Sequence, residues 1–290
     1  MFFLKFLFII FVFFLSISSS ESIDYYSPEN ILKFADYLYS EKDYRRAGME
    51  YERYISLEPL VSEDILYKIG LCYRNSGDIG KALKYFQRIE TEYPDTNLRP
   101  ALYYHNAYCY IILGNYDESI KYLDENINKL KNPDEVMKLQ ILKALCYLKQ
   151  KRWHEAENFL GSITSPANSE NFSYMLQSLR RNAQEGIAIK RKSPILAGTL
   201  SSLIPGSGKA YCKQYGDGIF SFMLTTATGL LAYDAFREDK IKSIKGWIFA
   251  GISAIFYAGN IYGSSISAKV YNYQKEMNIL NNLPELPDDW

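Results

Sequence analysis

The middle of the chain repeats itself every 35 to 37 residues, and this periodicity restricts the possible folds more than any other feature of the sequence. One column of small residues recurs at separations of 35, 37 and 37 and consists of Ala35, Gly70, Ala107 and Ala144. A second column has the same separations and consists of Ala47, Ala82, Ser119 and Ala156. Periods of this length are typical of solenoids, in which each unit buries its apolar face only by stacking on its neighbours.

Each column has a physical reason in a pair of antiparallel helices. A small residue in the first helix allows the second helix to approach, and a large residue three positions later lies on the same helix face. These large residues are Leu38, Tyr73, Tyr110 and Tyr147, and their counterparts in the second helices are Tyr51, Phe86, Leu123 and Leu160. Gly77 and Gly114 mark turns between paired helices, while Pro59 and Pro94 end second helices. The pattern therefore predicts stacked helical hairpins.

These residues resemble the tetratricopeptide repeat, a two-helix unit of about 34 residues. The resembling units are Pro28–Val61, Glu63–Asn97, Pro100–Pro133 and Met137–Glu170, and a capping helix is expected at Asn171–Ile189. The departures from the repeat pattern are Leu38 at the aromatic position, Lys42 and Lys151 at turn glycines, Ser119 for alanine, Lys143 for leucine and the missing closing proline of the third unit. The resemblance implies an all-α solenoid.

The resemblance also implies a superhelix whose concave face is lined by the first helix of each unit. In this register the groove carries Asp36, Tyr67, Leu71, Arg74, Tyr104, Tyr108, Ile111 and Leu145. An aromatic groove with few charges suits an extended peptide or a helix of a partner protein. The alternative is that these aromatic side chains only pack between helices.

Composition argues against several kinds of chemistry. The 33 basic and 33 acidic residues balance, so the chain lacks the electrostatic footprint of a nucleic-acid-binding protein. Cys72, Cys109 and Cys146 share one repeat position, which places them on the order of 10 Å apart, too far for disulfides, so we expect free buried thiols. His105 and His154 lie in different units without a ligand pattern. We expect no metal, no cofactor and no catalytic residues, and hence no enzyme.

The first 20 residues are typical of a secretory signal. Lys5 precedes an unbroken apolar run from Phe6 to Leu15, and the small residues Ser18 and Ser20 follow. The run is short for a membrane-spanning helix, which needs about 20 apolar residues. An uncleaved anchor is the alternative, and in both cases we expect the following polypeptide to be exported.

The last third of the sequence predicts a membrane hairpin. Gly218–Tyr233 carries no charge, and Gly246–Ala268 gives 23 uncharged residues in a row, about 34 Å of helix against a hydrocarbon core of about 30 Å. We expect transmembrane helices at about 218–236 and 246–268. Small residues that favour helix packing in lipid are Ser221, Thr225, Gly229 and the pair Gly259 and Gly263. The alternative is a soluble apolar hairpin packed on the repeats.

The stretch Ser193–Phe220 resembles the opening of small bacterial two-helix membrane modules. The matching positions are Ser193, Pro194, Pro205, Gly206, Gly208, Tyr211, Gly216, Asp217 and Gly218, whereas Lys209 stands where Gln is commoner. We expect Leu196–Leu203 to lie along the membrane interface or to re-enter the membrane, and Pro205–Gly208 to turn the chain. Gly206-Ser207-Gly208-Lys209 is also similar to a phosphate-binding loop, but Leu203 and Ala210 replace its first Gly and its Ser/Thr, so no nucleotide is expected.

Together these features predict four segments: a signal peptide at 1–20, a repeat array at 21–192, a membrane module at 193–273, with an interfacial segment at 193–211, and a tail at 274–290. The basic loop Arg237–Lys245 favours a cytoplasmic side for itself, although Lys190, Arg191, Lys192, Lys209 and Lys213 lie on the other side. Following the signal, we expect a bacterial inner-membrane protein whose array faces the periplasm. The leading hypothesis is a scaffold that holds a protein partner. The alternative is an accessory factor for membrane-protein insertion or transport, in which Asp217, Asp234 and Asn260 of the hairpin serve a polar path.

Overall fold

The computed structural model describes residues 26–58, 60–163 and 170–287, and the predicted signal segment at residues 1–20 lies outside them. Within the described ranges the chain forms helices and no strand, as the predicted all-α class requires. The chain divides into two compact units, Met1–Leu130 and Lys131–Trp290, so the fourth predicted repeat belongs to the second unit.

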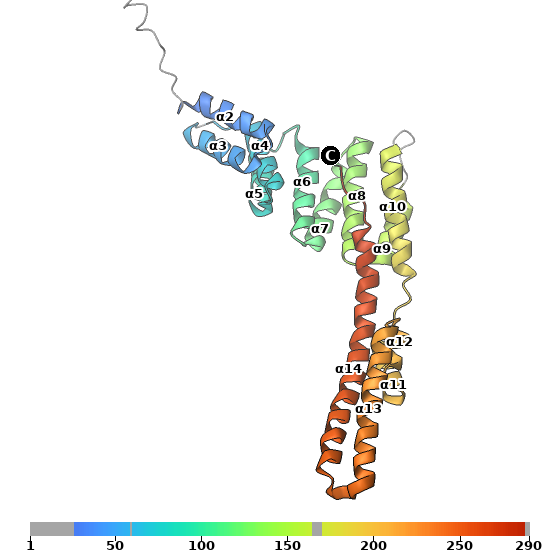
Figure 1. The fold of residues 1–290 in the computed structure, drawn as a ribbon. Coiled ribbons are helices and arrows are strands. Elements are labelled where there is room, and N and C mark those ends of the chain that lie inside the picture. The colour runs from blue at the N-terminus through green and yellow to red at the C-terminus, as the bar shows by residue number, and fades with distance from the viewer. Residues whose placement is uncertain (1–25, 59, 164–169, 288–290) are drawn as a thin grey trace, which may run out of the picture. The chain divides into compact units, whose positions relative to one another are not determined.

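Three helical hairpins make up the described part of the first unit (Figure 1). The helices are α2 (Pro28–Ser40), α3 (Tyr44–Leu57), α4 (Glu63–Asn75), α5 (Ile79–Glu92), α6 (Arg99–Ile112) and α7 (Tyr116–Asn126), followed by the short 3₁₀ helix η1 (Ile127–Lys129). Consecutive helices pack against each other from α2 to α7. The first helices of these three repeats therefore begin within one residue of the predicted starts at Pro28, Glu63 and Pro100.

The two columns of small residues form the tightest contacts inside the repeats. The six members of these columns that belong to the first unit are all buried. A Cβ atom on Gly70 would lie 2.4 Å from the Phe86 ring, so this position tolerates only glycine unless the ring moves. Ser119 stands where the other repeats have alanine, and its hydroxyl donates to the Ala107 carbonyl across the hairpin, at 3.1 Å.

The turns inside the hairpins share one conformation regardless of the residue type. Gly77 and Gly114 have φ values of 87° and 78°, and Lys42 occupies the same left-handed region at 61°. After Lys42 and after Gly114 the next residue donates its amide to a carbonyl of the first helix, Asp43 to Leu38 and Asn115 to Tyr110. Asp43 and Asp78 then cap the second helices through their carboxylates, so a lysine is accommodated where glycine would be easier.

The second unit opens with a fourth hairpin and a long additional helix. These are α8 (Pro133–Lys149), α9 (Trp153–Ser162) and α10 (Glu170–Ile187). Lys151 forms the turn between α8 and α9 with φ of 60°. Helix α10 packs on both, and a Cβ atom on Gly186 would lie 2.3 Å from the Trp153 ring. The predicted capping helix thus covers the last repeat.

The rest of the second unit consists of two short helices and an apolar helical hairpin (Figure 1). The short helices are α11 (Pro194–Leu203) and α12 (Ser207–Tyr211), and the hairpin consists of α13 (Tyr215–Asp239), η2 (Lys240–Lys242) and α14 (Ile244–Asn281). Helix α14 is longer than the sequence indicates, because residues 274–281, which we expected in a tail, continue the helix. No helix breaker precedes Pro284, and buried Ile279 lies beside α10 in the cleft described below.

Candidate partner-binding surface and membrane hairpin

The first helices of the repeats carry the residues predicted to line the groove. Tyr67, Leu71, Arg74 and Tyr108 are half-buried, and Asp36 is exposed. Tyr104 and Ile111 have only 5% and 7% of their surface exposed. Leu145 lies in α8 of the second unit and is 6% exposed. In the first unit, therefore, four half-buried side chains and one carboxylate offer most of the contact surface, while Tyr104 and Ile111 support them from beneath.

His105 is the centre of a polar and aromatic cluster on this surface. Its Nδ1 lies 2.8 Å from Nη1 of Arg74, and its Nε2 lies 2.9 Å from the Tyr67 hydroxyl. Since a guanidinium only donates, Nδ1 is the acceptor and the proton resides on Nε2. The imidazole ring also stacks on Phe86, with centroids 5.0 Å apart. His105 therefore fixes Arg74 and Tyr67 across two repeats, which is a packing role rather than a catalytic one.

Asp36 joins the first two repeats through its carboxylate. Oδ1 accepts from the Tyr51 hydroxyl at 2.5 Å and from Nζ of Lys68 at 2.6 Å. Although burial alone would raise the pKa of Asp36, these two hydrogen bonds and the Lys68 charge lower it below its ordinary value. The carboxylate remains charged and half-exposed, so it can still meet a basic group of a partner.

The cysteines are free and buried, as their spacing predicts. Burial raises the pKa of the Cys72 and Cys109 thiols to about 12, so they remain protonated at neutral pH and are poor nucleophiles. In the described ranges no group of three or more His, Cys, Asp or Glu residues could hold a metal ion.

Helices α13 and α14 have an inverted distribution of side chains compared with a soluble helix pair. The buried face of α13 consists of Gly218, Ser221, Thr225, Thr228 and Ala232, and that of α14 of Gly246, Asn260, Ser264, Ser267 and Ala268. Large apolar side chains point outward and include Phe220, Met223, Leu230, Leu231, Trp247, Ile248 and Ile255. Small residues at the contact and large apolar residues outside are typical of helices that pack in lipid.

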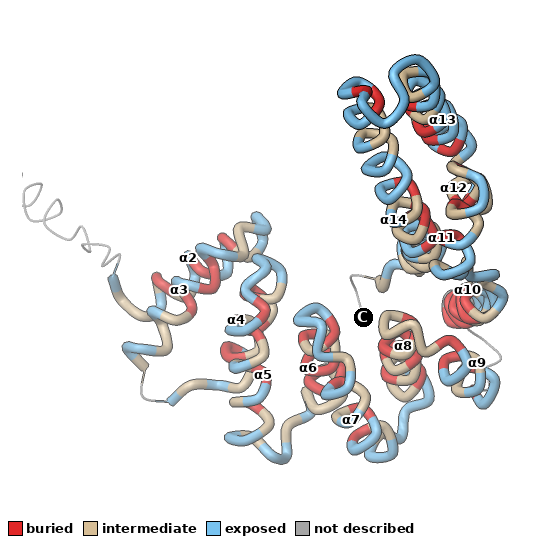
Figure 2. The backbone as a smooth tube through the Cα atoms, turned by 90° about the horizontal axis from the view of Figure 1, so that it is seen from below, coloured by how far each residue is buried: buried red, intermediate tan, exposed pale blue. Residues whose placement is uncertain are grey.

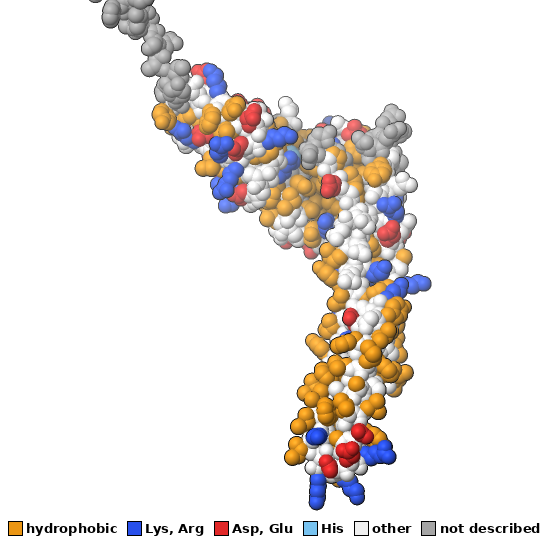
Figure 3. Space-filling view, in the orientation of Figure 1, with side chains coloured by type: hydrophobic (Ala, Val, Ile, Leu, Met, Phe, Trp, Pro, Cys, Tyr) orange, Lys and Arg blue, Asp and Glu red, His pale blue; other side chains and the backbone are white. Residues whose placement is uncertain are grey.

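Apolar side chains dominate the surface of the hairpin, and charged side chains lie at the turn between α13 and α14. Both helices are long and apolar enough to cross a membrane, and only 11% of the most apolar stretch of each is buried. Figure 2 shows that most of α13 and α14 is exposed. In Figure 3 hydrophobic side chains cover the visible face of the hairpin, and charged side chains gather where α13 turns into α14. That turn carries Arg237, Glu238, Asp239, Lys240, Lys242 and Lys245.

The contact between the two helices differs in one respect from the sequence prediction. Gly259 faces open space, so the predicted GxxxG pair does not mediate helix packing. The closest approaches are made by Gly246 beneath the Phe236 ring, by Gly229 opposite Ser253, and by Ser253 itself, whose hydroxyl lies 3.4 Å from the Thr225 carbonyl. The spacing of two glycines alone does not show which face of the helix they occupy. That face is indicated by the positions of the large apolar residues around the helix.

The predicted turn of the membrane module is held by backbone contacts that explain its glycines. Gly206 has φ of 85°, and a Cβ atom there would lie 1.9 Å from the Gly218 carbonyl oxygen. A Cβ atom on Gly208 would lie 1.9 Å from the Ala197 carbonyl oxygen. Pro205 precedes the turn, and the Tyr211 hydroxyl accepts from the Ser193 amide at 3.4 Å. These residues position α11, α12 and the start of α13 against one another.

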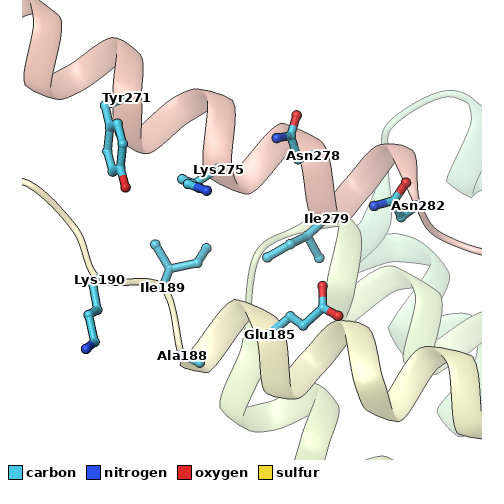
Figure 4. Close-up of a pocket in the computed structure, with 9 residues that line it drawn as sticks. All are labelled: Glu185, Ala188, Ile189, Lys190, Tyr271, Lys275, Asn278, Ile279 and Asn282. Carbon is cyan, nitrogen blue, oxygen red and sulfur yellow. The ribbon is translucent and has the colours of Figure 1, made fainter. Parts of the chain in front are cut away.

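A shallow cleft of about 350 Å³ lies between the end of α10 and the last part of α14 (Figure 4). Glu185 and Ile189 line one side, and Tyr271, Lys275 and Ile279 line the other. One carboxylate, amines and apolar side chains are mixed here, so the cleft has no single chemical preference.

Comparison with known families agrees with the hairpin geometry of the first unit. A family model described as a tetratricopeptide repeat matches residues 64–96, and a second model with the same description matches residues 100–125. No curated protein matches the chain. The two matched stretches contain nearly all of α4 to α7, so residues 64–125 are a tetratricopeptide repeat segment, a type of module that binds protein partners.

Proposed function

We propose that this chain is a membrane-tethered scaffold whose repeats hold a protein partner and whose C-terminal hairpin anchors it in a bilayer. The inverted hairpin, with small polar residues inside and large apolar residues outside, is the observation that carries the tether. The repeat segment with its half-exposed aromatic surface supports the partner-binding role. In keeping with the N-terminal signal, we place the scaffold in a bacterial inner membrane with the repeats in the periplasm.

Membrane association is tested by fractionation of the full chain. We expect the protein to sediment with membranes after cell lysis, to resist extraction at alkaline pH and to be released by detergent. Two arginines at the exposed apolar positions Met223 and Ile255 should weaken this association, because each costs about 2.5–3.5 kcal/mol near the centre of a bilayer. The same pair of substitutions at the exposed polar positions Gln177 and Gln184 of α10 is the control. Recovery of the parent chain in the supernatant without detergent would contradict the tether.

Partner binding is tested by crosslinking and capture from native membranes. Tyr108→Ala and Arg74→Ala each remove a half-buried side chain from the proposed surface, so capture of the partner should fall at least tenfold. Tyr37→Ala, which removes an exposed tyrosine outside this surface, should leave capture unchanged. Circular dichroism of each variant separates loss of contact from loss of fold. A captured protein that is insensitive to Tyr108 and Arg74 would rule out the groove.

The hairpin provides less support for the alternative, in which it forms a polar path for insertion or transport. Asp217 and Asp234 are exposed on the surface of α13. The Asn260 side chain forms hydrogen bonds with the backbone of Ser201 and Gly206. One amine, that of Lys209, reaches between α13 and α14, where it donates to Ser221 at 2.8 Å. Deletion of residues 193–273 with the repeats still exported distinguishes the roles, because a scaffold would keep its partner in a soluble form.

A further inference from the structure

Helix α11 runs antiparallel to α14, and hydrogen bonds connect residues 192–202 to residues 257–272 of α14. The Lys192 amide donates to Asn272 at 2.7 Å, and Ser265 donates to the Pro194 carbonyl at 3.0 Å. Further along, the Ser201 and Ser264 hydroxyls lie 2.7 Å apart. Finally the Tyr257 hydroxyl donates to the Ser202 carbonyl at 2.6 Å. As residue numbers rise in α11, those of its partners fall from 272 to 257, so α11 runs along the hairpin and not across its end.

The end of α11 lies beside the half of the apolar run of α14 that ends at Ala268. Tyr257 is the central residue of Gly246–Ala268, the 23 uncharged residues of α14. Eleven residues separate Tyr257 from Ala268, which corresponds to about 17 Å along the helix axis. The Tyr257 contact is made by the hydroxyl of a long side chain, whereas the backbone of the turn lies closer to the end of the apolar run. Gly206 packs against Gly218, the first residue of the uncharged run of α13, and bonds to Asn260, eight positions before Ala268. If the hairpin spans the membrane, the turn after α11 therefore lies in the half of the hydrocarbon core nearer to Ala268. Helix α12 then leads back, because Tyr211 contacts Ser193 at the start of α11.

The outward side of this short hairpin is apolar, and its hydroxyls bond locally. Ile195, Leu203 and Ile204 are 81%, 80% and 58% exposed. The Thr199 hydroxyl donates to the Ile195 carbonyl at 2.7 Å, and that of Ser202 donates to the Thr199 carbonyl at 2.8 Å. Ser207 likewise donates to Ile204 at 2.8 Å. Hydroxyls that bond to carbonyls of their own segment need no water, so this surface is compatible with lipid, as are the exposed apolar surfaces of α13 and α14.

The irregular backbone at the turn is also satisfied by protein groups. The side chain of Asn260, which is 4% exposed, accepts from the Gly206 amide at 3.0 Å and donates to the Ser201 carbonyl at 3.3 Å. The Ser201 hydroxyl accepts from the Gly208 amide at 2.9 Å. Non-helical backbone at membrane depth is tolerated only where such partners replace water.

We propose that residues 194–211 form a re-entrant hairpin, which enters the bilayer on the side of Lys192, turns at Pro205–Gly206 within the half of the bilayer nearer to that side and leaves on the same side. The inference rests on the proposed tether and adds to it a lipid-facing surface formed by Ile195, Leu203 and Ile204. Of the two placements that the sequence allows for this segment, along the interface or into the membrane, the antiparallel contact with α14 favours the second.

Cysteine accessibility in native membranes tests this placement. Single cysteines replace Leu203 at the turn, Ile255 on the lipid-facing side of α14, and exposed Lys190 before α11. Vesicles are resealed with a charged maleimide on both sides, and labelling of each residue is quantified by peptide mass spectrometry, so that the buried native cysteines do not interfere. Labelling in denaturant confirms that each thiol is competent. We expect Leu203→Cys and Ile255→Cys to react at least tenfold more slowly than Lys190→Cys.

The outcomes separate the two proposals. Rapid labelling of Leu203→Cys with a protected Ile255→Cys would overturn the re-entrant hairpin and leave the tether intact. Rapid labelling of both would overturn the tether and the re-entrant hairpin together. Protection of both, with rapid labelling of Lys190→Cys, supports the turn inside the bilayer.

Discussion

A half-buried carboxyl between the second and third repeats makes their stability depend on pH. Glu90 accepts from the Tyr122 hydroxyl, and its Oε2 accepts from Nδ2 of Asn106 at 2.9 Å. Burial raises the pKa of Glu90 above its ordinary value of 4.5, and the hydrogen bond from Tyr122 only partly opposes this. The folded state therefore holds the proton more tightly than the unfolded chain. This stabilisation is complete below the ordinary value and is lost as the pH rises through the raised one.

Glu90→Gln should remove this loss, because a carboxamide stays neutral at every pH. The Gln side chain can also donate to Oδ1 of Asn106, a buried atom without a hydrogen-bond partner in the described structure. We expect α5 and α7 amides in the variant to become progressively better protected than in the parent as the pH rises from 4.5 to 8, measured by hydrogen exchange at matched pH. Glu92→Gln, at the exposed pair with Arg88 on the same helix, is the control. A constant difference between variant and parent across this range would contradict the assignment.

At the scale of the element, the turns inside the repeats are defined by a backbone conformation and not by glycine itself. A Cβ atom on Gly114 would meet no neighbour, so Gly114→Ala isolates the cost of the left-handed conformation. We expect a loss of about 1 kcal/mol in the free energy of unfolding.

Lys42→Gly relieves the same strain in the first repeat and should stabilise by about 0.5–1 kcal/mol, whereas Lys42→Ala should change little. Local hydrogen exchange of α3 and α7 measures these changes, and an unaffected Gly114→Ala would refute the explanation.

The glycines of the membrane module have a different role, because backbone atoms lie where their Cβ atoms would be. Gly208→Ala would place a methyl group 1.9 Å from the Ala197 carbonyl oxygen, and a backbone contact of this kind has no flexible side chain that can yield. We expect the module to lose about 1–3 kcal/mol of stability, towards the upper end because the obstacle is backbone. The measurement is thermal unfolding and trypsin resistance of residues 193–273 in detergent. Gly216→Ala is the matched control, since that position faces open space, and equal behaviour of the two variants would contradict this reading.

The periodicity of the sequence predicts the helices and turns of the repeats because each unit repeats the same local demands. The small columns and the turn at Lys42 follow from the spacing. The pairing of Glu90 with Tyr122 does not, since 32 residues separate them and Glu90 belongs to no repeated column. Likewise Gly259 matches a packing motif but faces open space, and Gly246 and Ser253 of α14 make contacts with α13 instead. Long-range polar pairs depend on how each helix is oriented about its axis relative to its neighbours, and local residue spacing does not predict this orientation.

At the scale of the whole molecule, the second unit joins the fourth repeat to the membrane module through one carboxylate. Glu276, in the part of α14 beyond the apolar run, accepts from Nζ of Lys151 at 2.6 Å and from Arg191 at 2.9 Å. Lys151 forms the α8–α9 turn, and Arg191 lies between α10 and α11. The Glu276 side chain is only 13% exposed, so it is shielded from solvent more than a surface ion pair is. These contacts of Glu276 stabilise the helical conformation of α14 beyond Ala268.

Glu276→Ala should release this extension and leave the apolar part of α14 unchanged. Loss of two charge-assisted hydrogen bonds from a mostly buried carboxylate should lower the local opening free energy by about 1–2 kcal/mol, which corresponds to about 5- to 30-fold faster amide exchange over residues 271–281. Gln274→Ala removes an exposed side chain from the same turn of helix and should exchange like the parent. Because Lys151 and Arg191 would lose the same partner, the α8–α9 turn and the segment before α11 should exchange faster as well. Faster exchange confined to α14 would show that the helix extension is held by Ile279 and its neighbours in α10, and that Glu276 does not couple the repeat to the module.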